Sequence, residues 1–552
     1  MNPGELEAAL MAKVRSLFAS GAIGGAIPDR ISVERPKNRD HGDFATSAAL
    51  QLAKSAGIPP REIAQLLATA FAEIDGVEKA EIAGPGFINL KLVSGAQSAI
   101  VKTVLEQGKK YGEGNLLADV KINLEFISAN PTGPLHLGHT RWAAVGDAMA
   151  RVLSAAGAKV TREFYINDRG NQMDLFGASL AASAHGLPIP ENGYHGEYIK
   201  ELAKEIVAQN PEIIKLSGDD SLVAFREAGY KLQLAQQQSV LRHFGSIFDV
   251  WYSERKLHDS GAVANVAEKL KKNGHVYEDA GATWLRTTDF GDDKDRVLVK
   301  ADGEQTYFTS DTAYYLDKRS RGFDLCIYLL GADHHGYVGR LKALVSCTGD
   351  DPAKNLQVLI GQMVKIIENG EELKLSKRAG TIITLEELVE KVGVDAARYS
   401  LTRYPTDTPL TLDVDLLKKR TNENPVFYVQ YAHARISALL RNAKELGMKV
   451  EIADFKQELL DSEAEEALAA SIAHFPKVVA SAAELREPHR VARYLEELAG
   501  HYHHFYAHSR VLPMGDEPIT ALHQSRALLC DATRQVLANG LALLGVSAPE
   551  KM

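Results

Sequence analysis

The stretch of the sequence that points most directly to chemistry is SANPTGPLHLGHT, residues 128 to 140. Its two histidines, His136 and His139, flank a glycine between the apolar run INLEFI and the helix-like run WAAVGDAMARVL. Where a strand passes through a turn into a helix, unpaired backbone N–H groups and the positive end of the helix dipole favour phosphate. We therefore expect both imidazoles to stabilise charge on a transferring phosphate, and Gly138 to let a purine approach the backbone.

Two other interpretations of this histidine pair stay open on the spacing alone. An isolated pair of this kind is more often a helix cap or a packing element. Metal ligation is a third possibility, but the stretch lacks the glutamate and the spacing of the HExxH zinc motif. The cysteines are too few and too scattered for a zinc site or a disulfide framework, so we expect no zinc and a reducing, cytoplasmic compartment. They are Cys326, Cys347 and Cys530.

A basic motif, KLSKRAGT at residues 374 to 381, follows the last strand-like run of the central part of the chain. Together, HLGH and KLSKR are similar to the HIGH and KMSKS signatures of the class I aminoacyl-tRNA synthetases. The resemblance implies that Lys374 and Lys377 close over the ATP phosphates and neutralise charge on the leaving pyrophosphate. Leu375 and Arg378 depart from the consensus, and both changes are chemically tolerable.

Further motifs narrow this resemblance to one family. SANPTGPLHLGHTR is followed, in order, by YINDRGNQ, YFTSDTAYYLDK, YLLGADHHGY, GVDAARY and LGVSAPEKM. This series resembles the bacterial arginyl-tRNA synthetases, and the match covers essentially the whole chain. The resemblance implies ATP-dependent ligation of arginine to tRNA(Arg) through an arginyl-adenylate, with Mg²⁺ accompanying the ATP.

The pattern of helix-like and strand-like runs predicts an α/β protein of three domains. Residues 1 to 110 combine amphipathic helical runs with the strand-like GFINLKLV, which indicates a small α+β domain. Residues 115 to 405 begin with a strand–turn–helix–strand pattern and predict a Rossmann-like, class I nucleotide-binding catalytic domain. Only amphipathic helical runs follow Asn424, so residues 420 to 552 predict an all-α bundle, for which the resemblance implies anticodon binding.

Two irregularities are expected within the catalytic domain. A polar helical stretch from about 171 to 275 separates the two halves of the predicted sheet and is interpreted as an insertion. Asp302-Gly303, between RVLVKA and QTYFTS, marks a hairpin, so we expect that the sheet is not purely parallel.

The resemblance also implies an arginine pocket. A guanidinium is planar with five donors, so the carboxylates of Asp311 and Glu125 suit it through charge-assisted bonds, with Tyr307 alongside. Asn130 and one histidine of GADHHGY, taken as His335, are expected at the α-amino or carboxylate end, although the sequence does not separate the role of His335 from that of His334. The expected arginine-binding set is Glu125, Ser128, Asn130, His139, Tyr307, Asp311 and His335.

The expected ATP-binding set combines both signatures with a ribose-binding acid. It consists of His136, Gly138, His139, Asp333, Gln362, Met363, Lys374, Ser376 and Lys377. Simpler interpretations stay open for two acids: Asp311 as the N-cap of the helix that follows it, and Asp333 as an ordinary turn residue.

For tRNA, the resemblance implies contacts at both ends of the chain. The net charge of −9 gives no overall basic footprint, so RNA must be held by local patches, and we expect no DNA partner. The residues expected in the last domain follow a helical spacing that is also typical of a packed core, so several of them must simply belong to that core. The expected residues are Arg35, Lys37, Arg39 and Phe44 in the first domain, and Tyr428, Gln430, Tyr431, His433 and Arg435 in the last.

The remaining expectations follow from length and composition. No apolar run reaches the ~18 residues that a membrane span requires, so we expect no membrane partner. We also expect a monomer, located in the cytoplasm. A stand-alone nucleotidylyltransferase also uses an HxGH turn but is a much smaller chain than 552 residues. A catalytically inactive tRNA-binding paralogue is the non-enzymatic alternative, and the intact HLGH and KLSKR motifs argue against it.

Overall fold

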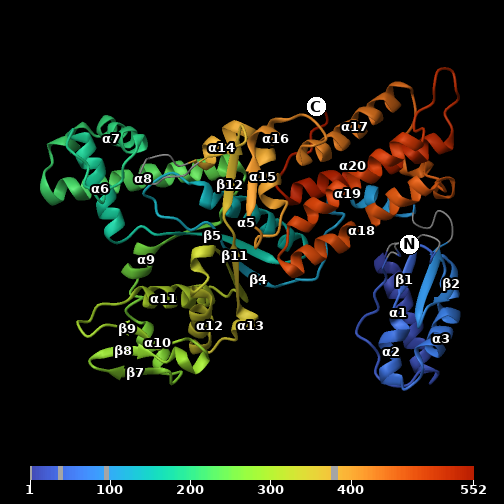
Figure 1. Cartoon of the computed structure of the whole chain (residues 1–552), viewed down its shortest axis with the longest axis horizontal. Helices are drawn as coiled ribbons and strands as arrows, with labels where there is room; N and C mark the ends of the chain where they lie inside the picture. The colour runs from blue at the N-terminus through green and yellow to red at the C-terminus, as the bar shows by residue number, and fades with distance from the viewer. Residues whose placement is uncertain (1–2, 35, 37–40, 93–97, 374–382) are drawn as a thin grey trace.

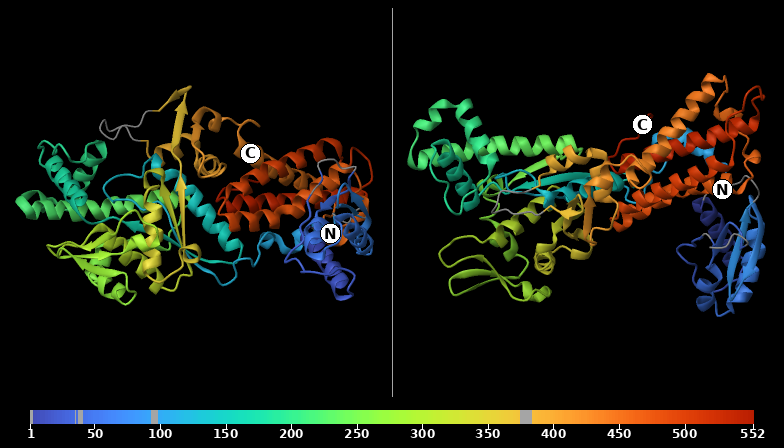
Figure 2. Two further views of the ribbon diagram at one scale, coloured as in Figure 1. Left: turned by 60° about the horizontal axis from the view of Figure 1, so that its bottom comes forward. Right: turned by 45° about the horizontal axis from the view of Figure 1, so that its top comes forward.

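The structure is a computed structural model that describes residues 3–34, 36, 41–92, 98–373 and 383–552. Three views show an elongated molecule (Figures 1 and 2). The N-terminal domain lies next to the C-terminal helices at one end, and the inserted helices lie at the other end, with the catalytic sheet between them. Within the described ranges, no helix is both long and apolar enough to cross a bilayer.

The N-terminal domain has its own hydrophobic core. Its helices are α1 (Pro3–Ala19), α2 (Ala48–Ala56) and α3 (Pro60–Ala72), and its strands are β1 (Phe44–Thr46), β2 (Val77–Ala83) and β3 (Phe87–Leu92). The strands form an antiparallel sheet in the order β1-β3-β2, and the helices bury their apolar faces against it. An ion pair of 3.1 Å from Glu7 to Lys477 reaches the C-terminal bundle.

The central sheet has five parallel strands in the order β11-β10-β4-β5-β6. They are β4 (Lys121–Glu125), β5 (Lys159–Ile166), β6 (Val250–Ser253), β10 (Leu325–Gly331) and β11 (Leu356–Gly361). The chain runs outward to one side from β4 and then returns to the other side through β10. This reversal creates a crevice beyond the carboxyl ends of β4 and β10, where doubly wound folds bind their ligands.

The elements around the central sheet position its loops. They include α4 (Ile100–Gln107), η2 (Gly108–Lys110), α5 (Leu137–Ala155), α6 (Asn171–Ala184), α7 (Glu197–Gln209), η3 (Pro211–Lys215), α8 (Gly218–Phe244), α9 (Glu254–Asp259) and α10 (Val266–Lys271). After these come η4 (Thr287–Phe290), α11 (Tyr307–Ser320), η5 (Ala332–His334), α12 (Tyr337–Cys347), α13 (Pro352–Asn355), α14 (Leu385–Val392), α15 (Val394–Thr402) and α16 (Val414–Lys418).

The Rossmann-like fold is confirmed, but the central sheet differs from the prediction in two ways. All its pairings are parallel, and the antiparallel pairings of this domain belong to two separate small sheets. One consists of β7 (Val276–Asp279), β8 (Ala282–Leu285) and β9 (Arg296–Val299). In the other, β12 (Val364–Glu368) pairs antiparallel with β13 (Glu371–Glu372) and parallel with β14 (Leu410–Asp413). The expected turn at Asp302-Gly303 does form, with an antiparallel bridge between Val299 and Gln305, but it belongs outside the central sheet. The rest of QTYFTS is the start of α11, because Thr306 takes the extended N-cap conformation. The presumed insertion also contains β6, an edge strand of the sheet itself.

The C-terminal region is the predicted helical bundle. Its elements are α17 (Pro425–Glu445), η6 (Ile452–Asp454), η7 (Gln457–Leu459), α18 (Glu463–Leu485), α19 (His489–His508) and α20 (Ala521–Leu543). One continuous hydrophobic core runs from the sheet into the bundle. Tyr111, just before the sheet, donates its hydroxyl to the carbonyl of Ile472 at 3.0 Å, and its own carbonyl accepts from Asn539 at 2.9 Å. Catalytic domain and bundle are thereby packed as one unit.

A single buried guanidinium, that of Arg398 on α15, joins the elements that meet behind the sheet. It lies 2.5 Å from Asp147 on α5 and donates to the carbonyls of Phe244 at 2.9 Å and Leu544 at 3.0 Å. Gly545 is needed beside it: its φ is +65°, and an added Cβ would lie 2.1 Å from a nitrogen of Arg398. The motifs GVDAARY and LGVSAPEKM, far apart in sequence, therefore form one contact.

We expect Arg398→Met to lower the free energy of unfolding by roughly 3 kcal/mol, because it leaves the buried carboxylate of Asp147 without its main partner. Gly545→Ala should act in the same direction through the clash with Arg398. The midpoint of urea denaturation measures both effects. Lys419→Met, which breaks an exposed pair with Glu423, is the control and should leave the midpoint unchanged. Equal midpoints for Arg398→Met and this control would contradict the role given to Arg398.

Candidate active site

A cavity of about 1040 Å³ lies at the carboxyl ends of β4 and β10, where the strand order reverses. Its walls come from the residues after β4, the HLGH turn, α11, the turn after β10 and the residues between β11 and β12. Among the predicted residues that line it are Glu125, Ser128, His136, Gly138, His139, Asp311, Asp333, Gln362 and Met363. Members of both expected ligand sets therefore meet in one cavity.

The HLGH turn forms the amino end of α5, and its two histidines cap this helix reciprocally. The Nδ1 atom of His136 accepts from the backbone N–H of Gly138 at 3.1 Å, and that of His139 accepts from the backbone N–H of His136 at 3.3 Å. Since both Nδ1 atoms are acceptors, the neutral rings carry their proton on Nε2. The capping interpretation and the phosphate interpretation thus describe different atoms of the same rings, which lie 4.1 Å apart between centroids.

There is a steric reason for a glycine at position 138 of this turn. A Cβ at position 138 would lie 3.0 Å from Cε1 of His136, tighter than ordinary contact. A larger residue would push the His136 ring away from the N–H groups that orient it. Gly138 therefore keeps the backbone at the helix start open to the cavity.

The chain that follows β4 takes an unusual course. Ile127 and Ser128 have φ values of +71° and +41°, and such values are rare for a β-branched residue such as isoleucine. This turn lets the hydroxyl of Ser128 donate to Glu125 at 2.8 Å and accept from the backbone N–H of Tyr165 at 3.1 Å. Strain of this kind costs roughly 1–3 kcal/mol per residue and clusters at functional sites.

Asp311 faces the cavity from the second turn of α11. The helix begins at Tyr307 with Thr306 as its N-cap, so the alternative that Asp311 is the N-cap is wrong. Tyr337 donates its hydroxyl to the Asp311 carboxylate. Burial raises the pKa of Asp311 to about 6, although the Tyr337 hydrogen bond opposes this shift, and the nearby charge of Glu125 adds to it.

Other expected arginine-binding residues lie elsewhere. Tyr307 is 86% exposed at the start of α11 and does not line the cavity. Asn130 is also outside the lining and bonds with Gln172. Of the two histidines after β10, His334 lines this cavity and His335 does not.

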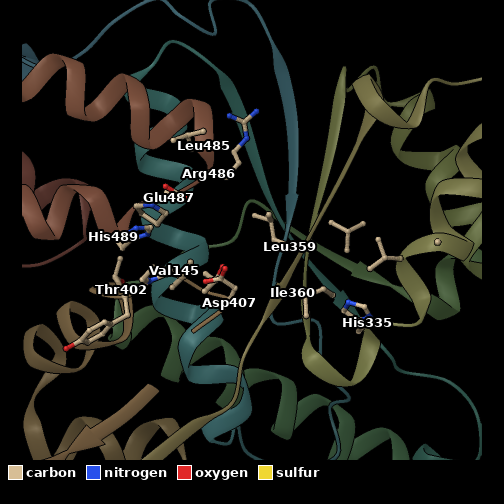
Figure 3. Close-up of a pocket in the computed structure, with 17 residues that line it drawn as sticks. Val145, His335, Leu359, Ile360, Thr402, Asp407, Leu485, Arg486, Glu487 and His489 are labelled. Atoms are coloured by element: carbon tan, nitrogen blue, oxygen red, sulfur yellow. The ribbon is translucent and has the colours of Figure 1, made fainter. Parts of the chain in front are cut away.

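His335 instead lines a second cavity of about 550 Å³. Figure 3 shows this cavity between β11, with Leu359 and Ile360, and the turn from α18 to α19, which carries Arg486, Glu487 and His489. Asp407, from the segment after α15, also lines it. The position of His335 in that wall separates it from Asp311 and Glu125.

Arg141 and Lys318 are site residues that the sequence analysis did not select. Arg141, in the first turn of α5, donates to the carbonyls of Gln362 at 3.2 Å, Thr408 at 2.8 Å and Pro405 at 2.6 Å, and burial lowers its pKa to about 10. Lys318 pairs with Glu125 at 2.5 Å. The only sequence signal was their place inside the motifs HLGHTR and YFTSDTAYYLDK.

The KLSKRAGT motif lies outside the described residues, and with it Lys374, Ser376 and Lys377. The residues directly after it are described and pair with the HLGH segment. The backbone N–H of Leu137 donates to the carbonyl of Ile383 at 3.0 Å, and that of Leu385 donates to the carbonyl of Leu135 at 2.8 Å. His136 and Thr384 form an antiparallel bridge between these two bonds. The chain that follows the basic motif, from Ile383 onward, therefore runs beside HLGH.

Comparison with known proteins now decides the family. The family model "tRNA synthetases class I (R), catalytic domain" matches residues 100–413, "Arginyl tRNA synthetase N terminal domain" matches residues 5–92, and "DALR anticodon binding domain" matches residues 429–552. The chain is 54% identical to the arginine–tRNA ligases of Paenarthrobacter aurescens and Pseudarthrobacter chlorophenolicus, with 100% of each chain covered.

The chain belongs to the arginyl-tRNA synthetases. Its fold is similar to that of the Thermus thermophilus arginyl-tRNA synthetase, with a TM-score of 0.78 over 100% of both chains at 22% identity. The predicted resemblance is thereby confirmed, as is the class I fold.

For an arginyl-tRNA synthetase, RNA contacts are expected on α17. The residues predicted to make them differ in how exposed they are. Gln430 is buried and donates to Asp395 at 2.8 Å, and the buried His433 contacts the carbonyl of Pro549 at 2.8 Å. Tyr431 is 37% exposed, and the guanidinium of Arg435 lies 5.9 Å from its ring centre. Tyr428 is half-buried, with its ring 5.0 Å from that of His503.

The expected RNA contacts of the N-terminal domain are described only in part. Phe44 is 3% exposed and belongs to the core of that domain. Arg35, Lys37 and Arg39 lie outside the described residues.

The raised pKa of Asp311 gives a pH dependence for arginine binding by this arginyl-tRNA synthetase. A guanidinium needs the ionised carboxylate, so the arginine KM should be lowest above pH 6 and rise toward tenfold per unit as pH falls through about 6, while the ATP KM stays flat. Steady-state arginylation from pH 5 to 8 measures this. The groups that face Asp311 are Tyr337, Glu125, Arg340, His334, Glu254 and Tyr165.

Two variants isolate the Asp311 carboxylate. Asp311→Asn should have a high arginine KM at every pH and lose the inflection. Burial raises the pKa of Glu254 to about 7, so Glu254→Gln tests whether that group is responsible instead, and the inflection near 6 should persist in it. Asp351→Asn keeps a good N-cap on α13 and serves as the unrelated control. An Asp311→Asn enzyme with the wild-type pH profile would rule out this assignment.

Proposed function

We propose that the protein joins arginine to tRNA(Arg) in two steps within the large cavity. The arginine carboxylate attacks the α-phosphorus of ATP, and pyrophosphate leaves. A ribose hydroxyl of the terminal adenosine then attacks the arginyl carbonyl, and AMP leaves. The observation that carries this proposal is the pairing of residues 383–385 with residues 135–137, because it brings the chain that follows the KLSKRAGT motif to the HLGH turn of a cavity whose other wall holds Glu125 and Asp311.

The phosphate end of the cavity would act through positioned donors rather than covalent catalysis. His136 and His139 hold their Nδ1 atoms on backbone N–H groups, so the donor that would follow charge on the α-phosphate is Nε2–H. Lys374 and Lys377 would neutralise the departing pyrophosphate, and Gly138 would let the nucleotide approach the backbone. Asp333, Gln362, Met363 and Ser376 complete the proposed ATP set.

The arginine end would act through Asp311, with Glu125 and Ser128 fixed beside it. We assign the α-amino or carboxylate end of arginine to His334 in place of His335, since His334 lines this cavity. Tyr307 and Asn130 stay in the proposed set only if the start of α11 and the SANPTG segment move toward bound arginine. Mg²⁺ would enter with ATP, held chiefly by phosphate oxygens and water. Among the described residues, no three His, Cys, Asp or Glu side chains converge as metal ligands.

For tRNA, the exposed part of α17 and α19 is the better supported surface. Tyr431 stacks on Phe427 with ring centres 5.8 Å apart and nearly parallel planes, and Arg435 lies 4.0 Å from the centre of the Tyr506 ring. Aromatic faces next to a guanidinium suit unstacked bases. Gln430 and His433 are proposed to support this surface from within. We further propose that the enzyme is a cytoplasmic monomer.

The direct test of this function is an aminoacylation assay with purified protein, ATP, arginine and total tRNA. Arginine should become attached to tRNA with release of AMP, and omission of either ATP or tRNA should abolish the product. A stand-alone nucleotidylyltransferase would release pyrophosphate without charging tRNA, and an inactive paralogue would do neither.

We expect His136→Ala and His139→Ala each to slow arginyl-adenylate formation by about 10²-fold, the scale of losing one preorganised donor, with little change in arginine affinity. Single-turnover formation of arginyl-tRNA from enzyme-bound ATP measures this. His195→Ala, in an exposed loop of the inserted region, is the matched control. Near wild-type rates in both HLGH variants would remove the phosphate role.

Tyr431→Ala and Arg435→Ala should each raise the KM for tRNA by about tenfold, because base stacking on an aromatic ring contributes roughly 1–3 kcal/mol. The kcat at saturating tRNA and the arginine KM should stay the same. Arg534→Ala, on another helix of the bundle, controls for loss of a surface cation. Unchanged tRNA kinetics in both variants would move the RNA surface elsewhere.

A further inference from the structure

Lys318 is a fully buried lysine that contacts Glu125, a residue of the cavity wall, without itself lining the cavity. It lies two turns of α11 beyond Asp311, and its side chain is 0% exposed. Its Nζ is 2.5 Å from Oε2 of Glu125. The same ammonium lies 3.8 Å from the ring centre of Tyr328 and 4.3 Å from that of Tyr314. One carboxylate in direct contact and two aromatic faces therefore surround this cation, and its charge also helps to lower the pKa of Glu163.

A buried ammonium is expensive unless it is paired, so its retention here calls for a reason. The neighbouring carboxylates suggest one. Glu163, on the next strand, has its own cation in Arg321 at 2.5 Å and accepts from the hydroxyl of Tyr314. Glu125 has Lys318. Within the described residues Asp311 forms no ion pair, and it accepts a hydrogen bond from the neutral hydroxyl of Tyr337.

We propose that Lys318 is a positioning residue that compensates the charge of Glu125 from below, so that Asp311 alone supplies the negative charge that attracts one cationic side chain. This inference rests on the proposed arginine end of the cavity. Glu125 then offers oxygen acceptors to the guanidinium without adding net charge. A cavity with two uncompensated carboxylates would take up a proton instead, because like charges in one site disfavour ionisation.

The proposal makes a specific claim about charge balance in variants. Glu125→Gln leaves the Lys318 ammonium unpaired beneath the guanidinium, so arginine binding should weaken at least 100-fold. Lys318→Met leaves two carboxylates together and should weaken binding about tenfold. The double variant Lys318→Met/Glu125→Gln restores the balance and should bind arginine within about tenfold of wild type. This non-additivity is the signature of a charge-compensating pair.

The measurement is the arginine Kd by titration calorimetry on the full-length protein, together with the KM values for arginine and ATP in arginylation. The ATP KM should change less than threefold in all variants. Arg319→Met is the matched control, because Arg319 is the next residue of α11 and pairs with Asp350 away from the cavity. It should leave the arginine Kd unchanged.

The double variant decides the question and is also the variant best able to fold, because replacing a buried ion pair by neutral groups of similar size is often neutral for stability. If it binds arginine as weakly as Glu125→Gln, then Glu125 acts as a direct charge partner and the proposal is overturned. A double variant that does not fold, judged by its thermal unfolding midpoint, would give Lys318 a purely structural role and would also overturn it. Failure of the wild-type protein to charge tRNA, with arginine binding intact, would refute the proposed function instead.

Discussion

The buried pair of Arg398 and Asp147 is the constraint on which the active site depends, because it fixes α5 from behind. Both side chains are fully buried, and the same guanidinium holds the end of α8 and the end of α20. Since α5 begins with HLGH, its position determines where the two histidines meet the cavity. Without Arg398, the buried carboxylate of Asp147 would keep only partly exposed partners, chiefly Arg151 at 2.7 Å, so the arrangement tolerates little change.

The front of α5 is held by a second guanidinium, and this one connects the site to the bundle. Arg141 binds carbonyls at Gln362 and in the segment 405–408, and Asp407 of that segment lines the second cavity opposite the turn between α18 and α19. The helix that carries HLGH is thus tied near its start and at its middle to chain that contacts the bundle. The active site and the bundle therefore contact the same helix, which gives a contiguous physical connection between them.

The sequence was most informative where structure is local. The strand before HLGH, the turn and the Ala-rich α5 were predictable, because apolar runs, a glycine turn and helical periodicity lie within a few residues of one another. QTYFTS resembled a strand by its aromatic and β-branched residues, and the N-cap Thr306 with its tertiary contacts overrode that preference. Strand β6 was missed because four residues inside a polar helical stretch carry no periodic signal. Motifs identified Glu125 and Asp311, but a single lysine or arginine is normally solvated, so nothing in the sequence marked Lys318, Arg141 or Arg398 as buried.

The two ends of the cavity differ in the sign of their electrostatic potential, and in the proposed arrangement this difference orients the two substrates. The end at α5 presents the two imidazoles at the positive end of a helix dipole, whereas the end at α11 presents carboxylates. In the proposed arrangement a nucleotide phosphate and a guanidinium would be drawn to opposite walls, and the arginine carboxylate would lie between them, facing the α-phosphate. Because Glu125 pairs with Lys318 and Glu163 pairs with Arg321, the acidic wall would not bind cations non-specifically. Orientation of both substrates, and not the strength of either interaction alone, is what this distribution of charge supplies.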